Sequence, residues 1–207
     1  MTIITSPYHT ITWDDQAATC IGNGAECEVF TTTLLDDDMV VKLPCYCDDH
    51  PYDTHEEWVN LFMDNAIKAW HMDVGPRVLG MVLNDEGDLI GYITYRVRTT
   101  DDIIEDIYDY TDLAYNNASP EDVDALNEWQ HSLQDEPGEA IFSFDTVEDL
   151  LHPNVKPFVE ELEKIDRSLS HFISMGICDM HMWNVGLCSE GEPITIDHGP
   201  YSMLQDL

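Results

Sequence analysis

The sequence predicts an α+β fold in two lobes, a small β-rich N-lobe over residues 1–98 and a truncated, mainly helical C-lobe over residues 99–207. Runs of β-branched and aromatic residues between Gly, Asn and Asp turns fill most of the first half, which favours strands. Apolar residues at helical spacing dominate the second half. A loop rich in Asp and Asn follows the last predicted helix, so we expect polar chemistry near the end of the chain.

The first predicted strands lie around a glycine turn. Residues 8–19 are a mixed lead-in, in which Trp13 packs a first short strand. Residues 20–30 combine closely spaced glycines with a β-branched and aromatic run, which predicts a strand, a tight turn and a returning strand. Residues 39–43 then predict a strand that ends at a proline.

Lys42 lies in that last strand and is one of only four lysines in the chain. Its neighbours favour burial, and a buried lysine is rare unless a carboxylate or a phosphate pairs with it. The alternative is a lysine at an edge, whose ammonium group reaches solvent.

A helix is predicted from residue 54 to about residue 70, where apolar residues recur at helical spacing. Thr54 and Glu57 fit a capping box, in which Glu57 only caps the helix. Alternatively, Glu56 or Glu57 reaches back to Lys42 and fixes its ammonium group in an ion pair.

The remaining elements bring the expected count to five strands with one inserted helix, followed by helices. In order, they are strands over 78–83 and 89–97, an acidic helix over 101–117, a short helix from Ser119 to Trp129, and a helix over 158–173 that ends at Gly176, a good stop residue.

The net charge is strongly negative. The chain carries 42 Asp and Glu against 8 Lys and Arg, a formal charge of −34. Such a surface repels nucleic acid and anionic membranes, so direct binding to either is not expected, and it favours basic proteins or cations. High solubility or a high-salt habitat explains the charge most simply. A polyanionic face that imitates nucleic acid and occupies a basic site on another protein is the sharper interpretation.

The N-terminus has no positive region and no sustained apolar run, which predicts neither a signal peptide nor a membrane span. We therefore expect a cytoplasmic protein. Among six Cys, Cys45 and Cys47 form the only close pair, and no second pair completes a zinc site. Reduced or buried thiols are the expected state.

Three polar residues near the end of the chain stand at a suggestive spacing. Asp179 is followed by Asn184 five residues later and by Asp197 thirteen after that, on a predicted loop, hairpin and loop. Such a set can hold Mg²⁺ against phosphate oxygens while one carboxylate orients a hydroxyl.

The order of these features resembles the protein-kinase-like superfamily over about residues 21–199. A strand, a Gly-rich turn, a strand, Lys42, a helix, two strands and further helices precede D-x-H-x-x-N at 179–184 and D-x-G at 197–199. The D-x-H-x-x-N form and the glycine turn look most like those of the early serine/threonine protein kinases of bacteriophages.

The resemblance implies a site for ATP and Mg²⁺. The turn would let backbone N–H groups approach the phosphates, one residue would cover the adenine, and Lys42 would hold the α and β phosphates. The residues implied in nucleotide binding are Gly22, Asn23, Gly24, Val29, Lys42 and, through the lysine, Glu57.

The resemblance also implies the roles of the later loops. Asp179 would accept or orient the attacking hydroxyl, Asn184 and Asp197 would ligate Mg²⁺, and Gly199 would permit the turn after the metal ligand. His181 either braces the catalytic loop or is a buried, hydrogen-bonded histidine.

The sequence departs from the family pattern in three ways. Cys27 occupies the place of the third glycine, where it either stiffens the turn or packs as an inert thiol. Residues 177–178 replace the usual His-Arg pair before the catalytic Asp. Only eight residues follow Gly199, so no room remains for an activation segment. Another surface would then find the substrate, or the chain would act on itself.

Three functions follow as hypotheses. The first is a phage-type Mg·ATP-dependent serine/threonine protein kinase that acts on host proteins in the host cytoplasm. The alternative is a catalytically dispensable, highly acidic kinase-like protein that binds and inhibits a host nucleic-acid-processing or defence factor. A small-molecule kinase is the third, although the C-lobe is short for one.

Overall fold

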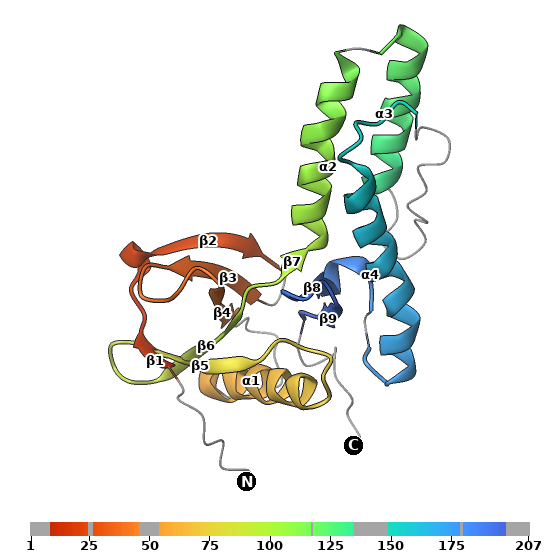
Figure 1. The fold of residues 1–207 in the computed structure, drawn as a ribbon. Coiled ribbons are helices and arrows are strands. Elements are labelled where there is room, and N and C mark those ends of the chain that lie inside the picture. The colour runs from red at the N-terminus through yellow and green to blue at the C-terminus, as the bar shows by residue number, and fades with distance from the viewer. Residues whose placement is uncertain are drawn as a thin grey trace. The chain divides into compact units, whose positions relative to one another are not determined.

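The computed structural model describes residues 9–24, 27–45, 54–116, 118–134, 149–178 and 180–197. These residues confirm the α+β class, with a six-stranded mixed sheet, a three-stranded sheet and four α-helices (Figure 1). The chain divides into two compact units, which are described separately. Among the described residues, the first unit contains 9–96 and Asp197, and the second contains 97–196. None of the helices described has the length and apolar character that a membrane span requires.

A six-stranded sheet forms the first unit, and it includes the first short strand expected in the lead-in, which the count of five had not included. This strand pairs parallel with a strand some seventy residues later, as His9 opposite Gly80 shows. All other neighbours are antiparallel. The strands, in the sheet order β1-β5-β6-β4-β3-β2, are β1 (His9–Thr12), β5 (Val78–Leu83), β6 (Leu89–Tyr95), β4 (Met39–Pro44), β3 (Cys27–Thr32) and β2 (Ala18–Asn23).

Helix α1 (His55–His71) packs on one face of this sheet. Thr54 is its N-cap, and the Thr54 hydroxyl accepts a hydrogen bond of 3.2 Å from the Glu57 N–H. This confirms the predicted capping by Thr54. The buried cluster between α1 and the sheet consists of Trp58, Phe62, Ala66, Val78 and Tyr92.

The opposite face of the sheet has its own apolar cluster. Val41 and Ile93 are fully buried there, on the two central strands. Trp13 of the lead-in joins this cluster and meets the Phe30 ring edge-on, with ring centroids 5.1 Å apart. The period-2 alternation of β4 therefore sends Val41 to this face and Lys42 to the α1 face.

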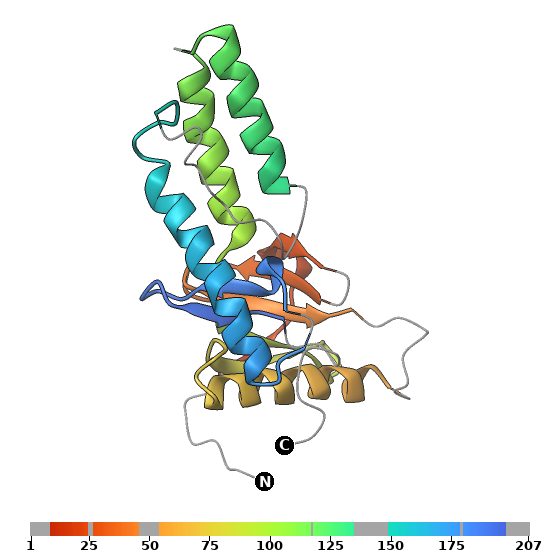
Figure 2. The same cartoon turned by 90° about the vertical axis from the view of Figure 1, so that its right-hand side faces the viewer.

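In the described residues, the second unit consists of three α-helices and a small sheet. Figure 2 shows α2 and α3 side by side, and α4 packs against α2 as well. Their inward faces bury Ile103, Ile107, Leu126, Leu162 and Ile165. The elements are β7 (Arg98–Thr99), α2 (Thr100–Tyr115), α3 (Pro120–Gln134), α4 (Lys156–Ser174), the 3₁₀ helix η2 (Met182–Asn184), β8 (Val185–Leu187) and β9 (Pro193–Thr195).

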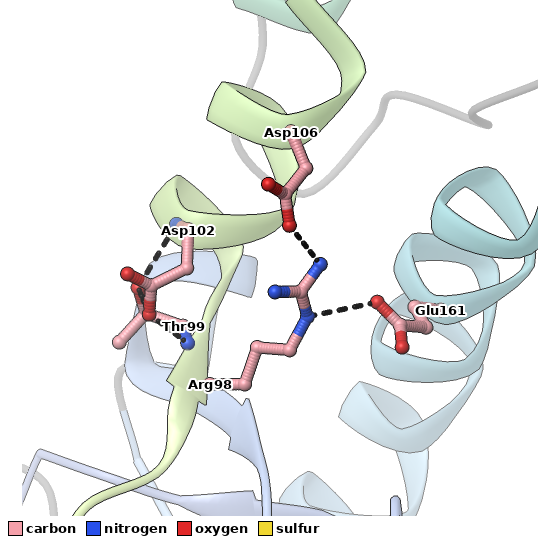
Figure 3. Close-up of polar contacts among 5 residues, drawn as sticks. All are labelled: Arg98, Thr99, Asp102, Asp106 and Glu161. Carbon is pink, nitrogen blue, oxygen red and sulfur yellow. Dashed lines mark hydrogen bonds and ion pairs between the residues drawn. The ribbon is translucent and has the colours of Figure 1, made fainter. Parts of the chain in front are cut away.

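Two helix starts carry reciprocal caps that the sequence analysis did not use. At α2, Asp102 accepts from the N–H and hydroxyl of Thr99, both at 2.8 Å (Figure 3). At α3, Asp122 accepts from the N–H and hydroxyl of Ser119. These caps start both helices. Helix α3 extends beyond Trp129, where its end was predicted.

Arg98 ties the helices of the second unit to β7. Its guanidinium group pairs with Asp106 of α2 at 2.7 Å and with Glu161 of α4 at 3.0 Å (Figure 3). It also lies over the Phe158 ring, 5.4 Å from the ring centroid. Since Arg98 pairs with Leu187 across β7 and β8, this network holds the small sheet against the helices.

Candidate functional site

The predicted glycine turn is a hairpin between β2 and β3. Gly22 lies opposite Val29, and the Gly24 N–H donates a 3.0 Å hydrogen bond to the Cys27 carbonyl oxygen. A Cβ added at Gly22 would lie 3.6 Å from Val29, an ordinary contact. Among the described residues, positive φ occurs at other glycines, so neither glycine of the turn is required by its backbone conformation. The Gly24 N–H is already used within the hairpin, and the lack of side chains at Gly22 and Gly24 leaves the backbone of the turn uncovered by their own side chains.

Lys42 lies on β4, inside the sheet and not at its edge. Its direct cross-strand neighbours are Val29 on β3 and Tyr92 on β6. Directly opposite residues of antiparallel strands project from the same face, so the three side chains share the α1 side. Lys42 itself is half-buried.

Gly91 makes the close approach of β6 to Lys42 possible. A Cβ at this position would lie 2.4 Å from the Lys42 carbonyl oxygen and 2.5 Å from a methyl group of Leu43. Sequence analysis did not single out this glycine, because its role depends on the register between two strands.

Cys27 is part of the α1-side core. Its side chain packs against the cluster of Trp58, Phe62 and Tyr92. Burial raises the pKa of its thiol to about 12, with Lys42 opposing the rise and Cys45, Asp197 and Glu28 adding to it. The thiol is therefore protonated at neutral pH, which favours the packed over the reactive interpretation.

Asp197 belongs to the same unit as Lys42 and acts electrostatically on its surroundings. Its carboxylate raises the pKa of the Cys27 thiol. Burial, then Cys27, then Asp197 also raise the pKa of the Tyr92 hydroxyl well above its ordinary range. Lys42 and Asp197 therefore act in opposite directions on the pKa of the same buried thiol.

The α1 carboxylates are not on the helix face that packs on the sheet. The Glu56 and Glu57 side chains are both exposed. The buried polar residue of α1 is Asn65, which is 4% exposed and follows Phe62 by one turn. Sequence analysis missed Asn65, although its position on the apolar stripe was a usable signal.

In the second unit, the predicted catalytic loop begins where α4 ends. Gly176 has φ 81°, and its N–H bonds the Ile173 carbonyl oxygen at 2.9 Å, which confirms it as the stop residue. The Thr100 hydroxyl donates to the Met182 carbonyl oxygen at 2.8 Å, and the Trp183 indole N–H donates to Asp101 at 2.8 Å. The start of α2 thus fixes the loop.

His181 immediately precedes η2. Its carbonyl oxygen accepts a 2.9 Å hydrogen bond from the Asn184 N–H. Its ring Nδ1 is buried and has no hydrogen-bond partner among the residues that the structure describes. A buried ring nitrogen of this kind is a polar group to which a ligand or a neighbouring loop can supply a partner.

Asn184 is 8% exposed and lies where η2 passes into β8. Strands β8 and β9 pair with Val185 opposite Thr195, and the Ile196 N–H donates to the Asn184 carbonyl oxygen at 2.9 Å. Asn184, which precedes β8, and Ile196, which follows β9, therefore meet at one end of this hairpin, although twelve positions separate them in sequence.

Asp179 and Gly199, to which the sequence analysis gave roles, lie outside the described residues. In the described part of the chain, no three His, Cys, Asp or Glu side chains form a group able to hold a metal. The amide oxygen of Asn184 and the carboxylate of Asp197 are nevertheless donors that suit Mg²⁺, which is usually held by one or two protein oxygens together with phosphates and water.

In comparisons with known proteins, no family model and no curated protein sequence matches this chain.

Proposed function

We propose that the protein is a Mg·ATP-dependent phosphotransferase with a kinase-like fold, similar to the early serine/threonine kinases of bacteriophages, and that it acts on host proteins. The observation that carries the proposal is the position of Lys42 inside the sheet, directly opposite Val29 of the strand that follows the glycine turn, in the unit that also contains Asp197. A lysine beside such a turn suits phosphate, and a carboxylate suits a metal ion.

The order of elements in the first unit supports the proposal further. A glycine hairpin leads to β4 with Lys42, then α1 crosses to β5 and β6, which is the order implied by the resemblance. When bound, Mg·ATP supplies the phosphoryl group and neutralises part of its charge. Gly22 and Gly24 would let the phosphates approach the backbone of the turn, and Val29 beside Lys42 would cover the base.

The later loops supply the remaining roles. Asn184 and Asp197 would hold Mg²⁺, and Asp179 would orient the acceptor hydroxyl and take its proton. His181 would brace the loop between them, since its carbonyl oxygen already fixes the Asn184 N–H. The acceptor would be a serine or threonine, and the charge of −34 favours basic protein substrates.

The test is phosphate transfer from γ-labelled ATP with Mg²⁺ to the protein itself, to histone and to proteins of a bacterial lysate. We expect label on protein, and a loss of at least about a hundredfold in Lys42→Ala and Asp197→Ala. Lys68→Ala, on the exposed side of α1, is the matched control and should retain activity. Label that persists in both site variants, or none from the folded wild type at saturating Mg·ATP, overturns the proposal.

A second candidate is an acidic inhibitor that needs no catalysis. It is favoured by exposed acids on α2 and α3, namely Glu105, Asp109, Glu121, Asp124 and Glu128. The double variant Asp179→Ala/Asp197→Ala separates the two functions. If it keeps both its fold and the biological effect of the wild type, the inhibitor is supported; if the effect disappears with the fold preserved, it is rejected.

A further inference from the structure

Tyr92 and Cys27 form a buried, uncharged pair on the α1 side of the six-stranded sheet. Tyr92 is 1% exposed and packs with Trp58 and Phe62 of α1. Cys27 packs against the same cluster from β3. Because Tyr92 is directly opposite Lys42, it projects from the sheet beside the lysine.

Asp197 lies within electrostatic range of both members of this pair. It contributes to the raised pKa of the Tyr92 hydroxyl and to that of the Cys27 thiol, after the larger effect of burial. Both groups are consequently neutral at physiological pH. They add no charge that competes with Lys42 and Asp197, and the phenol keeps its O–H as a donor.

Tight packing gives these two residues a mechanical link to the predicted site. The Tyr92 ring is held in the α1 core, so its hydroxyl has little freedom of position. The Cys27 carbonyl oxygen accepts the hydrogen bond from the Gly24 N–H at 3.0 Å, while the Cys27 side chain packs in the α1 core, so one residue joins the glycine turn to that core.

We propose that Tyr92 and Cys27 are positioning residues that hold Lys42 and the glycine turn in a fixed relation to the α1 core. Tyr92 acts on Lys42, its cross-strand neighbour, and Cys27 acts on the turn. The expected change in KM for ATP rests on the proposed function. The expected coupling between substitutions in the unfolding free energy of the ligand-free protein does not.

The first experiment compares Tyr92→Phe with Tyr95→Phe, the same substitution at an exposed position of the same strand. For Tyr92→Phe we expect KM for ATP to rise about three- to tenfold, because Lys42 is held less firmly for phosphate binding. The value of kcat should change by less than about twofold. Tyr95→Phe should leave both constants unchanged. A lower kcat together with an unchanged KM for ATP would contradict the positioning role.

The second experiment is a double-mutant cycle on the unfolding equilibrium of the ligand-free protein. Tyr92→Phe combined with Lys42→Met should depart from additivity by at least about threefold in the equilibrium constant, because the two residues are direct cross-strand neighbours, while Tyr95→Phe with Lys42→Met should be additive. If Tyr92→Phe does not fold, Cys27→Ala takes its place in the cycle. Additivity in the Tyr92 cycle, or in the Cys27 cycle that replaces it, overturns the proposal even if the wild type is an active kinase. Coupling supports it even if no phosphate transfer occurs, in which case the proposed function fails alone.

Discussion

The Ile196 N–H donates a 2.9 Å hydrogen bond to the carbonyl oxygen of Asn184, and this bond closes the β8–β9 hairpin at the end where its flanking residues meet. Asn184 immediately precedes β8, and Ile196 immediately follows β9. Antiparallel pairing thereby turns a separation of twelve residues in sequence into neighbouring backbone positions. In the proposed function, Asn184 is a ligand of Mg²⁺.

Asn184 should set the magnesium requirement of the proposed reaction. In Asn184→Ala the amide oxygen is lost, and we expect the Mg²⁺ concentration for half-maximal phosphate transfer to rise about tenfold or more. Asn60→Ala, on the half-buried side of α1, is the control and should not change it. The measurement is a Mg²⁺ titration of phosphate transfer at fixed ATP. An unchanged titration in folded Asn184→Ala removes Asn184 from the metal site.

Gly22 and Gly91 should respond differently to the same substitution. In Gly91→Ala the new Cβ would lie 2.4 Å from the Lys42 carbonyl oxygen, so we expect a loss of about 2–4 kcal/mol in unfolding free energy. In Gly22→Ala the Cβ meets Val29 at 3.6 Å, and stability should change by less than about 1 kcal/mol. ATP affinity should nevertheless fall in Gly22→Ala, as calorimetry can measure. Equal stability loss in the two variants would argue against this account of the turn.

Arg98 should contribute more to the free energy of unfolding than Arg167, which also pairs with a carboxylate. Its side chain is 33% exposed and joins two helices through Asp106 and Glu161, so Arg98→Ala should cost about 1–2 kcal/mol after solvent screening. Arg167, 71% exposed and paired with Glu163 one turn away, should cost less than about 0.5 kcal/mol when replaced by Ala. Urea unfolding at low and high salt measures both. Similar values for the two variants would show that the Arg98 network is not structural.

Alkaline pH should destabilise the protein through Cys27. Burial raises its pKa from 9.0 to about 12 in the folded state. A group whose folded pKa is raised contributes stability that is complete below the unfolded pKa, here about pH 9, and is lost as pH rises toward 12. The slope is at most about 1.4 kcal/mol per pH unit for one proton. The raised pKa of Tyr92 acts in the same direction at still higher pH.

Unfolding by urea at several pH values between 8 and 11 measures this dependence. In Cys27→Ala the unfolding free energy should fall less steeply with rising pH than in the wild type, whatever the stability of the variant at pH 8. Cys20→Ala, which removes an exposed thiol from the neighbouring strand, should keep the wild-type slope. Identical slopes in all three proteins would mean that the Cys27 thiol ionises freely.

Local patterns in the sequence determined the fold class and most of the elements. The alternation of β4, the helical spacing of α1 and α4, the cap at Thr54 and the stop at Gly176 act within a few residues, so the chain itself carries the signal. The order of the glycine turn, the lysine and the later Asp and Asn loops is also visible in the sequence. This order led to the hypothesis of an ATP site.

Only the tertiary structure decided which of these residues meet. The parallel pairing of β1 with β5 and the position of Lys42 between Val29 and Tyr92 depend on strand register over long sequence separations. A shift of one residue in register would send each side chain of a strand to the opposite face. The sequence therefore determined which polar groups are present, and long-range pairing decided that Lys42 lies inside the sheet, on the face where Tyr92 and Cys27 are packed against α1.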